Sequence, residues 1–131
     1  MKSLKYLFIL GILSFTFGCE DDLSADLNNF VSFEAKPIIE VPKNEAATFD
    51  IAVAAATTSN RERTYNVEVT DESTLTIENT VPGVVTIPAN SNVGTLSISL
   101  TDDDDLGFDA QMLVLSFVPQ ENISFGEDLE I

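Results

Sequence analysis

The chain has 131 residues, of which 22 are acidic and six are basic, so its formal net charge at pH 7 is −16. A surface with this charge repels nucleic acid and anionic lipid headgroups and attracts cations, so we expect no nucleic-acid partner. The sequence contains no histidine, which excludes Ser-His-Asp and Cys-His catalysis as well as zinc sites that need histidine.

The N-terminal 18 residues have the pattern of an export signal. Lys2 and Lys5 precede an apolar run from Tyr6 to Phe17, which is shorter than the roughly 20 residues that a membrane-spanning helix needs. Cys19, the only cysteine, stands at the expected cleavage point. A lone cysteine at this place resembles the lipidation site of a bacterial lipoprotein, which predicts a lipoprotein signal peptide over residues 1–18 and a membrane anchor at Cys19. The alternative is an ordinary signal peptide with an incidental cysteine.

The segment after the cysteine is acidic and has few apolar residues to bury. Glu20-Asp21-Asp22 resembles the surface-export signal of lipoproteins from Bacteroidota. We therefore expect residues 19–29 to form a flexible acidic tether, and the protein to be lipid-anchored in the outer membrane and exposed at the cell surface. The alternatives are a tether that is merely well solvated and a location on the periplasmic face.

The remainder of the sequence has the pattern of an all-β domain. Apolar residues alternate with polar ones in short runs, and turn-forming residues separate the runs at intervals of about 8–12 residues. Two such sets are Phe49, Ile51 and Val53, and Tyr65, Val67 and Val69. The sequence predicts a single antiparallel β-sandwich of the immunoglobulin-like type, with about seven strands, over residues 30–131.

The clearest strand lies in the middle of this domain. From Leu96 to Thr101 the alternation of apolar and polar residues is strict, which indicates a strand with one buried face. The turn-forming residues of Pro88–Asn92 stand before it and predict a tight connection from the strand at Val84–Ile87. Four consecutive aspartates, Asp102–Asp105, follow it, and because like charges repel they belong in solvent or around a cation.

Met112–Val118 is apolar at nearly every position, which favours a central strand buried on both faces. We expect it to pair beside the strand at Val93–Leu100, with Asp102–Asp109 as the connecting loop. Leu129–Ile131 has the pattern of the first residues of one more strand. A sandwich with an incomplete last strand has an open edge, which either another molecule or a longer natural domain would complete.

A family resemblance rests on four consecutive stretches of this region, namely Val84–Ala89, Gly94–Leu100, Asp102–Asp105 and Leu113–Phe117. Together they resemble the second half of a Calx-beta domain, and the resemblance extends loosely over about residues 30–125. It implies a β-sandwich in which acidic residues of the loop after the long strand bind calcium, with help from a glutamate early in the domain. By position that glutamate is Glu40.

The predicted metal site therefore consists of acidic residues from the loop and one from the start of the domain: Asp102, Asp103, Asp104, Asp105, Asp109 and Glu40. Calcium takes 6–8 oxygen ligands, which such a loop can supply. Successive side chains of an extended segment point to opposite faces, so the loop must curl to bring all its aspartates to one ion. A solvated loop that binds nothing is the alternative.

We expect the protein not to be an enzyme, because its acids fall in turns or on polar faces of strands rather than in apolar pockets. The expected function is that of a lipoprotein with a Calx-beta-like binding, adhesion or structural module, with calcium as its cofactor. Its partner would be a protein or glycan at the cell surface. Arg61 and Arg63 form the most concentrated positive charge and would contact an acidic partner, or only aid solubility. The main alternative function is an accessory subunit of an outer-membrane polysaccharide- or nutrient-uptake complex.

Overall fold

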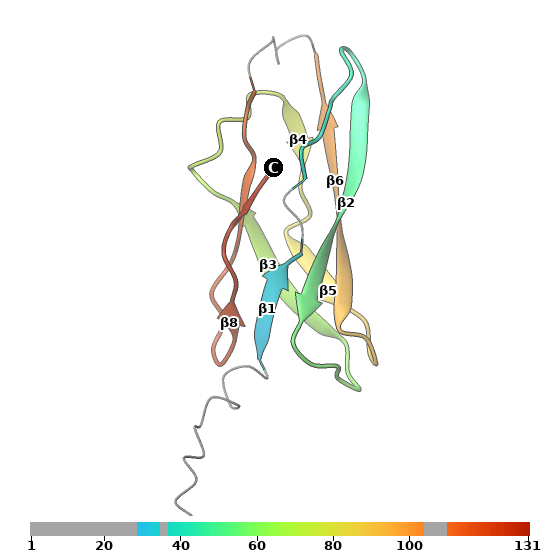
Figure 1. Cartoon of the computed structure of the whole chain (residues 1–131), viewed down its shortest axis with the longest axis vertical. Coiled ribbons are helices and arrows are strands. Elements are labelled where there is room, and N and C mark those ends of the chain that lie inside the picture. Colours follow the sequence, from blue (N-terminus) through green and yellow to red (C-terminus); the bar gives the residue numbers. More distant parts are fainter. Residues whose placement is uncertain (1–28, 35–36, 104–109) are drawn as a thin grey trace, which may run out of the picture.

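The computed structural model describes residues 29–34, 37–103 and 110–131. In this part of the chain nine strands form two sheets, and there is no helix that could cross a membrane (Figure 1). The strands are β1 (Phe30–Phe33), β2 (Ala46–Ala55), β3 (Arg63–Val69), β4 (Glu78–Thr80), β5 (Val84–Ile87), β6 (Val93–Thr101), β7 (Val114–Phe117), β8 (Ser124–Phe125) and β9 (Leu129–Glu130).

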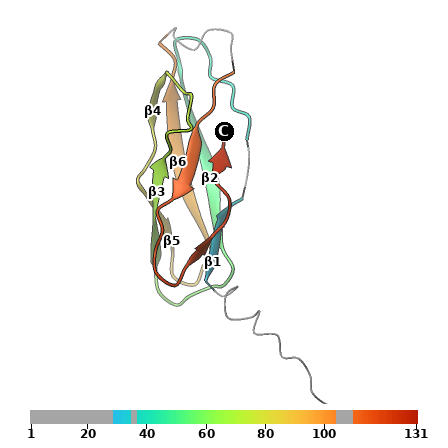
Figure 2. The ribbon, with the colours of Figure 1, turned by 90° about the vertical axis from the view of Figure 1, so that its left-hand side faces the viewer.

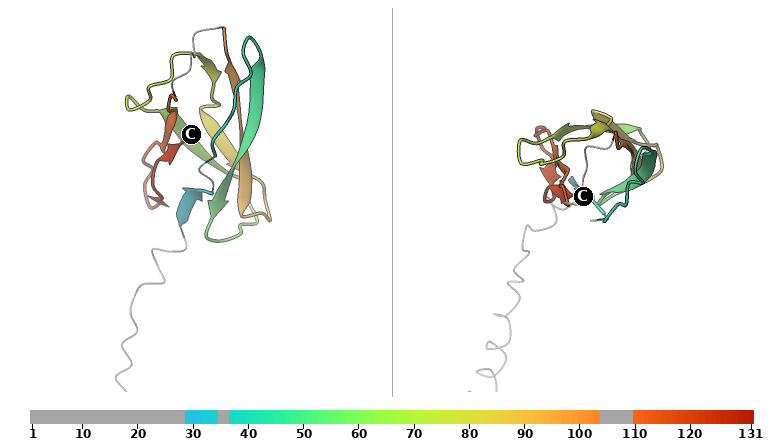
Figure 3. Two further views of the ribbon diagram at one scale, coloured as in Figure 1. Left: turned by 45° about the horizontal axis from the view of Figure 1, so that its top comes forward. Right: turned by 90° about the horizontal axis from the view of Figure 1, so that it is seen from above.

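One sheet has the strand order β4-β6-β2-β1-β8 and the other has the order β5-β3-β7-β9. The two sheets form separate layers (Figure 2), and they curl around the space between them when seen from above (Figure 3). The predicted all-β sandwich is therefore confirmed. It is not wholly antiparallel, because β8 pairs with β1 in the parallel direction.

The β2–β6 pair runs the full length of the sandwich, from Ala46 opposite Thr101 to Ala54 opposite Val93. Its inward-facing residues Leu96, Ile98 and Leu100 are buried, as the alternation predicted. Burying a side chain of this kind contributes about 1.5–3 kcal/mol relative to leaving it exposed. This pair therefore anchors the first sheet to the core.

Four aromatic rings cross the core between the two sheets. Phe117 of β7 stacks on Phe33 and on Phe125, with ring centroids 4.2 Å and 4.8 Å apart. Phe125 in turn meets Tyr65 of β3 edge to face at 6.2 Å. Such geometries add about 0.5–1.5 kcal/mol per pair beyond the burial of area. These ring contacts join β1 and β8 of one sheet to β3 and β7 of the other.

The prediction that β7 pairs with β6 is wrong. This strand lies between β3 and β9, in the sheet opposite β6, so the connection after β6 passes from one layer to the other. The prediction of burial on both faces is confirmed, since Leu113, Val114 and Leu115 are all buried. The chain after β3 also lies against this strand, where the amide of Val114 donates a hydrogen bond of 2.9 Å to the Ser73 hydroxyl.

The connection from β5 to β6 is tight, as predicted. The amide of Ser91 donates to the Pro88 carbonyl at 3.2 Å, and Asn90 has a positive φ of 61°. The two strands lie in different sheets, and Gly94 of β6 is where their backbones approach each other. A Cβ atom at Gly94 would overlap the carbonyl oxygen of Thr86.

Candidate functional site

The described part of the predicted acidic site lies at the end of β6. Asp102 is buried, with 5% of its surface exposed, and its amide donates to the Glu45 carbonyl at 3.1 Å. Asp103 is exposed. The remaining aspartates of the prediction, Asp104, Asp105 and Asp109, lie outside the described residues.

Glu40, the sixth predicted ligand, is exposed at the same end of the sandwich. Its neighbour Ile39 lines a largely apolar cavity of about 290 Å³, together with Leu100 and Ala110 on the two sides of the acidic loop. Within residues 29–34, 37–103 and 110–131, no three acidic or cysteine side chains gather as metal ligands do. The calcium site, which depends largely on the loop between Asp103 and Ala110, therefore stays a prediction.

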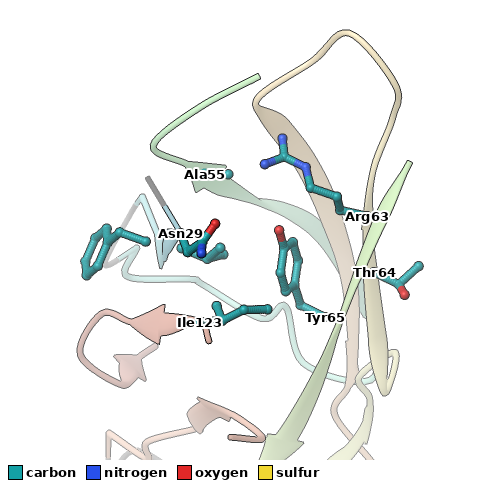
Figure 4. Close-up of a pocket in the computed structure, with 8 residues that line it drawn as sticks. Asn29, Ala55, Arg63, Thr64, Tyr65 and Ile123 are labelled. Atoms are coloured by element: carbon teal, nitrogen blue, oxygen red, sulfur yellow. The ribbon is translucent and has the colours of Figure 1, made fainter. Parts of the chain in front are cut away.

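A second cavity, of about 260 Å³, opens at the other end of the sandwich (Figure 4). It is built from segments far apart in the sequence, because the start of β1, the end of β2, the start of β3 and the turn before β8 meet there. Its lining residues are Asn29, Phe30, Val31, Ala55, Arg63, Thr64, Tyr65 and Ile123.

Arg63, half-buried at the start of β3, supplies the positive charge of this cavity. Its Nη2 donates a hydrogen bond of 2.9 Å to the Ser91 carbonyl in the β5–β6 turn. Its Nε is buried and has no hydrogen-bond partner in the described part of the chain. A buried donor without a partner costs about 1–3 kcal/mol. The guanidinium is therefore held in place by β3 and the turn, and only Nη2 donates a hydrogen bond to the described part of the chain.

Tyr65 follows two residues later on the same face of β3, because side chains alternate along a strand. Its ring is buried, with 4% of the residue exposed, and packs edge-on against Phe125. Its hydroxyl points toward Arg63, and the side-chain amide of Asn29 faces the same space (Figure 4). Thr64 points away from it. The cavity thus presents a guanidinium, a hydroxyl and an amide above apolar walls.

Sequence reasoning found only part of this second site. It singled out Arg61 and Arg63 together as loop charges, whereas Arg61 is exposed in the loop and Arg63 begins a strand. The alternating pattern placed Tyr65 in the core, and its ring does lie there. Placing Arg63 in a loop was therefore wrong, because it is the first residue of β3 and shares a face with Tyr65. Nothing in the sequence showed that Asn29 and Ile123 would join them.

No protein-family model and no curated protein matches the sequence. Among solved structures, the fold is similar to part of a multidomain protein including DUF1735 from Bacteroides ovatus, with a TM-score of 0.58 and 18% sequence identity. The match covers 76% of this chain and 43% of that chain, so this chain spans less than half the length of its structural neighbour. At this identity the similarity shows the shared β-rich fold alone.

Proposed function

We propose that this chain is an outer-membrane lipoprotein, anchored through Cys19 and exposed at the cell surface, whose Calx-beta-like sandwich acts as a non-catalytic binding and adhesion module. The observation that carries the proposal is a single β-sandwich that follows a signal-like segment with a cysteine at its end. The sandwich presents loops and a cavity at its ends, where such folds usually bind their partners.

The structural neighbour bears on the proposed role as a module. A fold similar to this chain occurs within a larger multidomain protein of Bacteroides ovatus. A sandwich that recurs as one part of a longer chain is typical of a module that is combined with others. Function must still be argued from the sites themselves, because one fold serves many functions.

Calcium is proposed as a ligand of the acidic loop that begins at Asp102. The support is the charge pattern, together with the placement of Glu40 at the same end of the sandwich as Asp103. A divalent cation would neutralise the mutual repulsion of the carboxylates in such a loop.

The test of the anchor is fractionation of cells that produce the wild-type chain or Cys19→Ser. We expect the wild-type chain in the outer-membrane fraction, accessible to protease in intact cells, and the variant in the soluble fraction. Replacing Glu20-Asp21-Asp22 by alanines is the matched variant for surface export, and it should keep the anchor but lose protease accessibility. Membrane association that is unchanged in Cys19→Ser would contradict the lipoprotein proposal.

A further inference from the structure

The cavity at Arg63 stands out because of its charge. The chain as a whole carries a net charge of −16, yet this cavity holds a half-buried guanidinium with no ion pair among the described residues. A guanidinium has five N–H donors, of which the Ser91 carbonyl accepts one. A buried polar group without a protein partner calls for an explanation, and a bound ligand is one.

We propose that this cavity binds the carboxylate of a small molecule whose remainder is uncharged. The carboxylate would accept hydrogen bonds from the Arg63 guanidinium, the Tyr65 hydroxyl and the Asn29 amide, all of which line the cavity. The uncharged remainder would lie against the apolar residues Val31, Ala55 and Ile123 of the cavity lining. Carboxylates bind arginine well because the planar group matches the guanidinium fork.

The charge balance favours a carboxylate over a phosphate or sulfate. Among the described residues that line the cavity Arg63 is the one cationic side chain, so it neutralises a single negative charge. A dianion would keep one charge unpaired in a molecule that is already strongly acidic, and the field of that molecule repels anions. A cation is disfavoured for the opposite reason, because the guanidinium repels it at close range.

The volume limits the size of the ligand. At about 260 Å³ the cavity is slightly smaller than the usual small-molecule site, so it suits one monosaccharide or one amino acid. Two sources share the required chemistry, namely a uronic acid of a glycan and the carboxyl end of a peptide. This inference deepens the proposed binding function and rests on it, but it does not involve Cys19, so failure of the anchor test and failure of this test are distinguishable.

The experiment is calorimetric titration of the full chain in mild detergent with four probes: methyl glucuronoside, its neutral analogue methyl glucoside, N-acetyl-leucine and its neutral analogue N-acetyl-leucinamide. We expect at least one carboxylate to bind about tenfold or more tightly than its neutral analogue, since hydrogen bonds to charged groups are the strong ones. A preference for the glucuronoside identifies a glycan source, and a preference for N-acetyl-leucine identifies a peptide source.

The variants assign the binding to the cavity. Arg63→Gln should weaken carboxylate binding by about tenfold or more, and Tyr65→Phe, which keeps the buried ring, should weaken it several-fold. Arg61→Gln removes the same charge from an exposed position two residues away and should change the affinity by less than about twofold. Circular dichroism checks that each variant is folded. The proposal is overturned if neither carboxylate binds more tightly than its neutral analogue, or if sulfate competes as well as the carboxylates do. It is also overturned if folded Tyr65→Phe and Arg61→Gln variants bind the carboxylate with the same affinity.

Discussion

Replacing Gly94 by alanine tests the close approach of the two sheets where β5 passes into β6. A Cβ atom at this position would overlap the carbonyl oxygen of Thr86 and would lie 3.0 Å from the carbonyl carbon and 3.1 Å from Cγ1 of Ile87. Two of these three atoms belong to backbone, so rotation of a side chain cannot relieve the contact. Either β5 or β6 must move, and the long ladder between β2 and β6 resists that movement.

Overpacking of this kind costs about 1–3 kcal/mol, and the contact with backbone places Gly94→Ala toward the upper end. For a domain of about 100 residues each kcal/mol lowers the melting temperature by about 4–8 °C, so we expect a decrease on the order of 10 °C or more. Gly83→Ala is the matched control, because its nearest atom would be the Val67 carbonyl oxygen at 4.0 Å. Urea and thermal unfolding measure both variants. Equal stability of Gly94→Ala and Gly83→Ala would refute the close approach.

Two further predictions concern a turn and the acidic loop. Asn90 has a φ of 61°, so Asn90→Ala should destabilise the fold by about 1 kcal/mol in urea unfolding while Asn90→Gly should not; equal losses in both variants would mean that the Asn90 side chain, rather than its backbone conformation, matters. Calcium at about 100 times its dissociation constant should stabilise the chain by about 2.7 kcal/mol, seen as a higher melting temperature that chelator reverses. Combining Asp103→Asn with Asp104→Asn should abolish this shift, and a shift that persists in the double variant would place the ion elsewhere.

The sequence pattern predicted where strands occur better than it predicted which strands pair. Alternation from Leu96 to Thr101 identified both the existence of β6 and its buried face, because burial of one face leaves a period of two in the sequence. The same pattern contains no information about which strand lies alongside. Met112–Val118 follows β6 in the chain, and consecutive strands pair often enough to favour that arrangement, yet β7 lies in the opposite sheet.

The two candidate sites differ in how far the sequence could predict them. Most of the predicted acidic site is the contiguous run Asp102–Asp105, so its charge pattern is visible without any fold. The cavity at Arg63 depends on Asn29 and Ile123, which are 94 residues apart in the numbering and meet only because β1 pairs with β8. The sequence pattern started this strand at Tyr65 and left Arg63 in the preceding loop, whereas β3 begins at Arg63. A cavity whose walls come from distant segments leaves no local signal in the sequence.

The two candidate sites lie at opposite ends of the sandwich, so the ligands proposed for them would bind far apart. Strand β2 extends from Ala46, beside the acidic end, to Ala55 in the cavity, a length of about 30 Å at 3.3 Å per residue. Screening makes charges this far apart nearly independent at physiological salt, where the Debye length is about 8 Å. Calcium and carboxylate binding can therefore be measured without interference.

The anchor proposed at Cys19 would be joined to the end of the sandwich that carries the cavity. Asn29, which lines the cavity, follows Cys19 by ten residues, a segment that reaches at most about 35 Å when fully extended. The cavity would therefore lie within about that distance of the anchor.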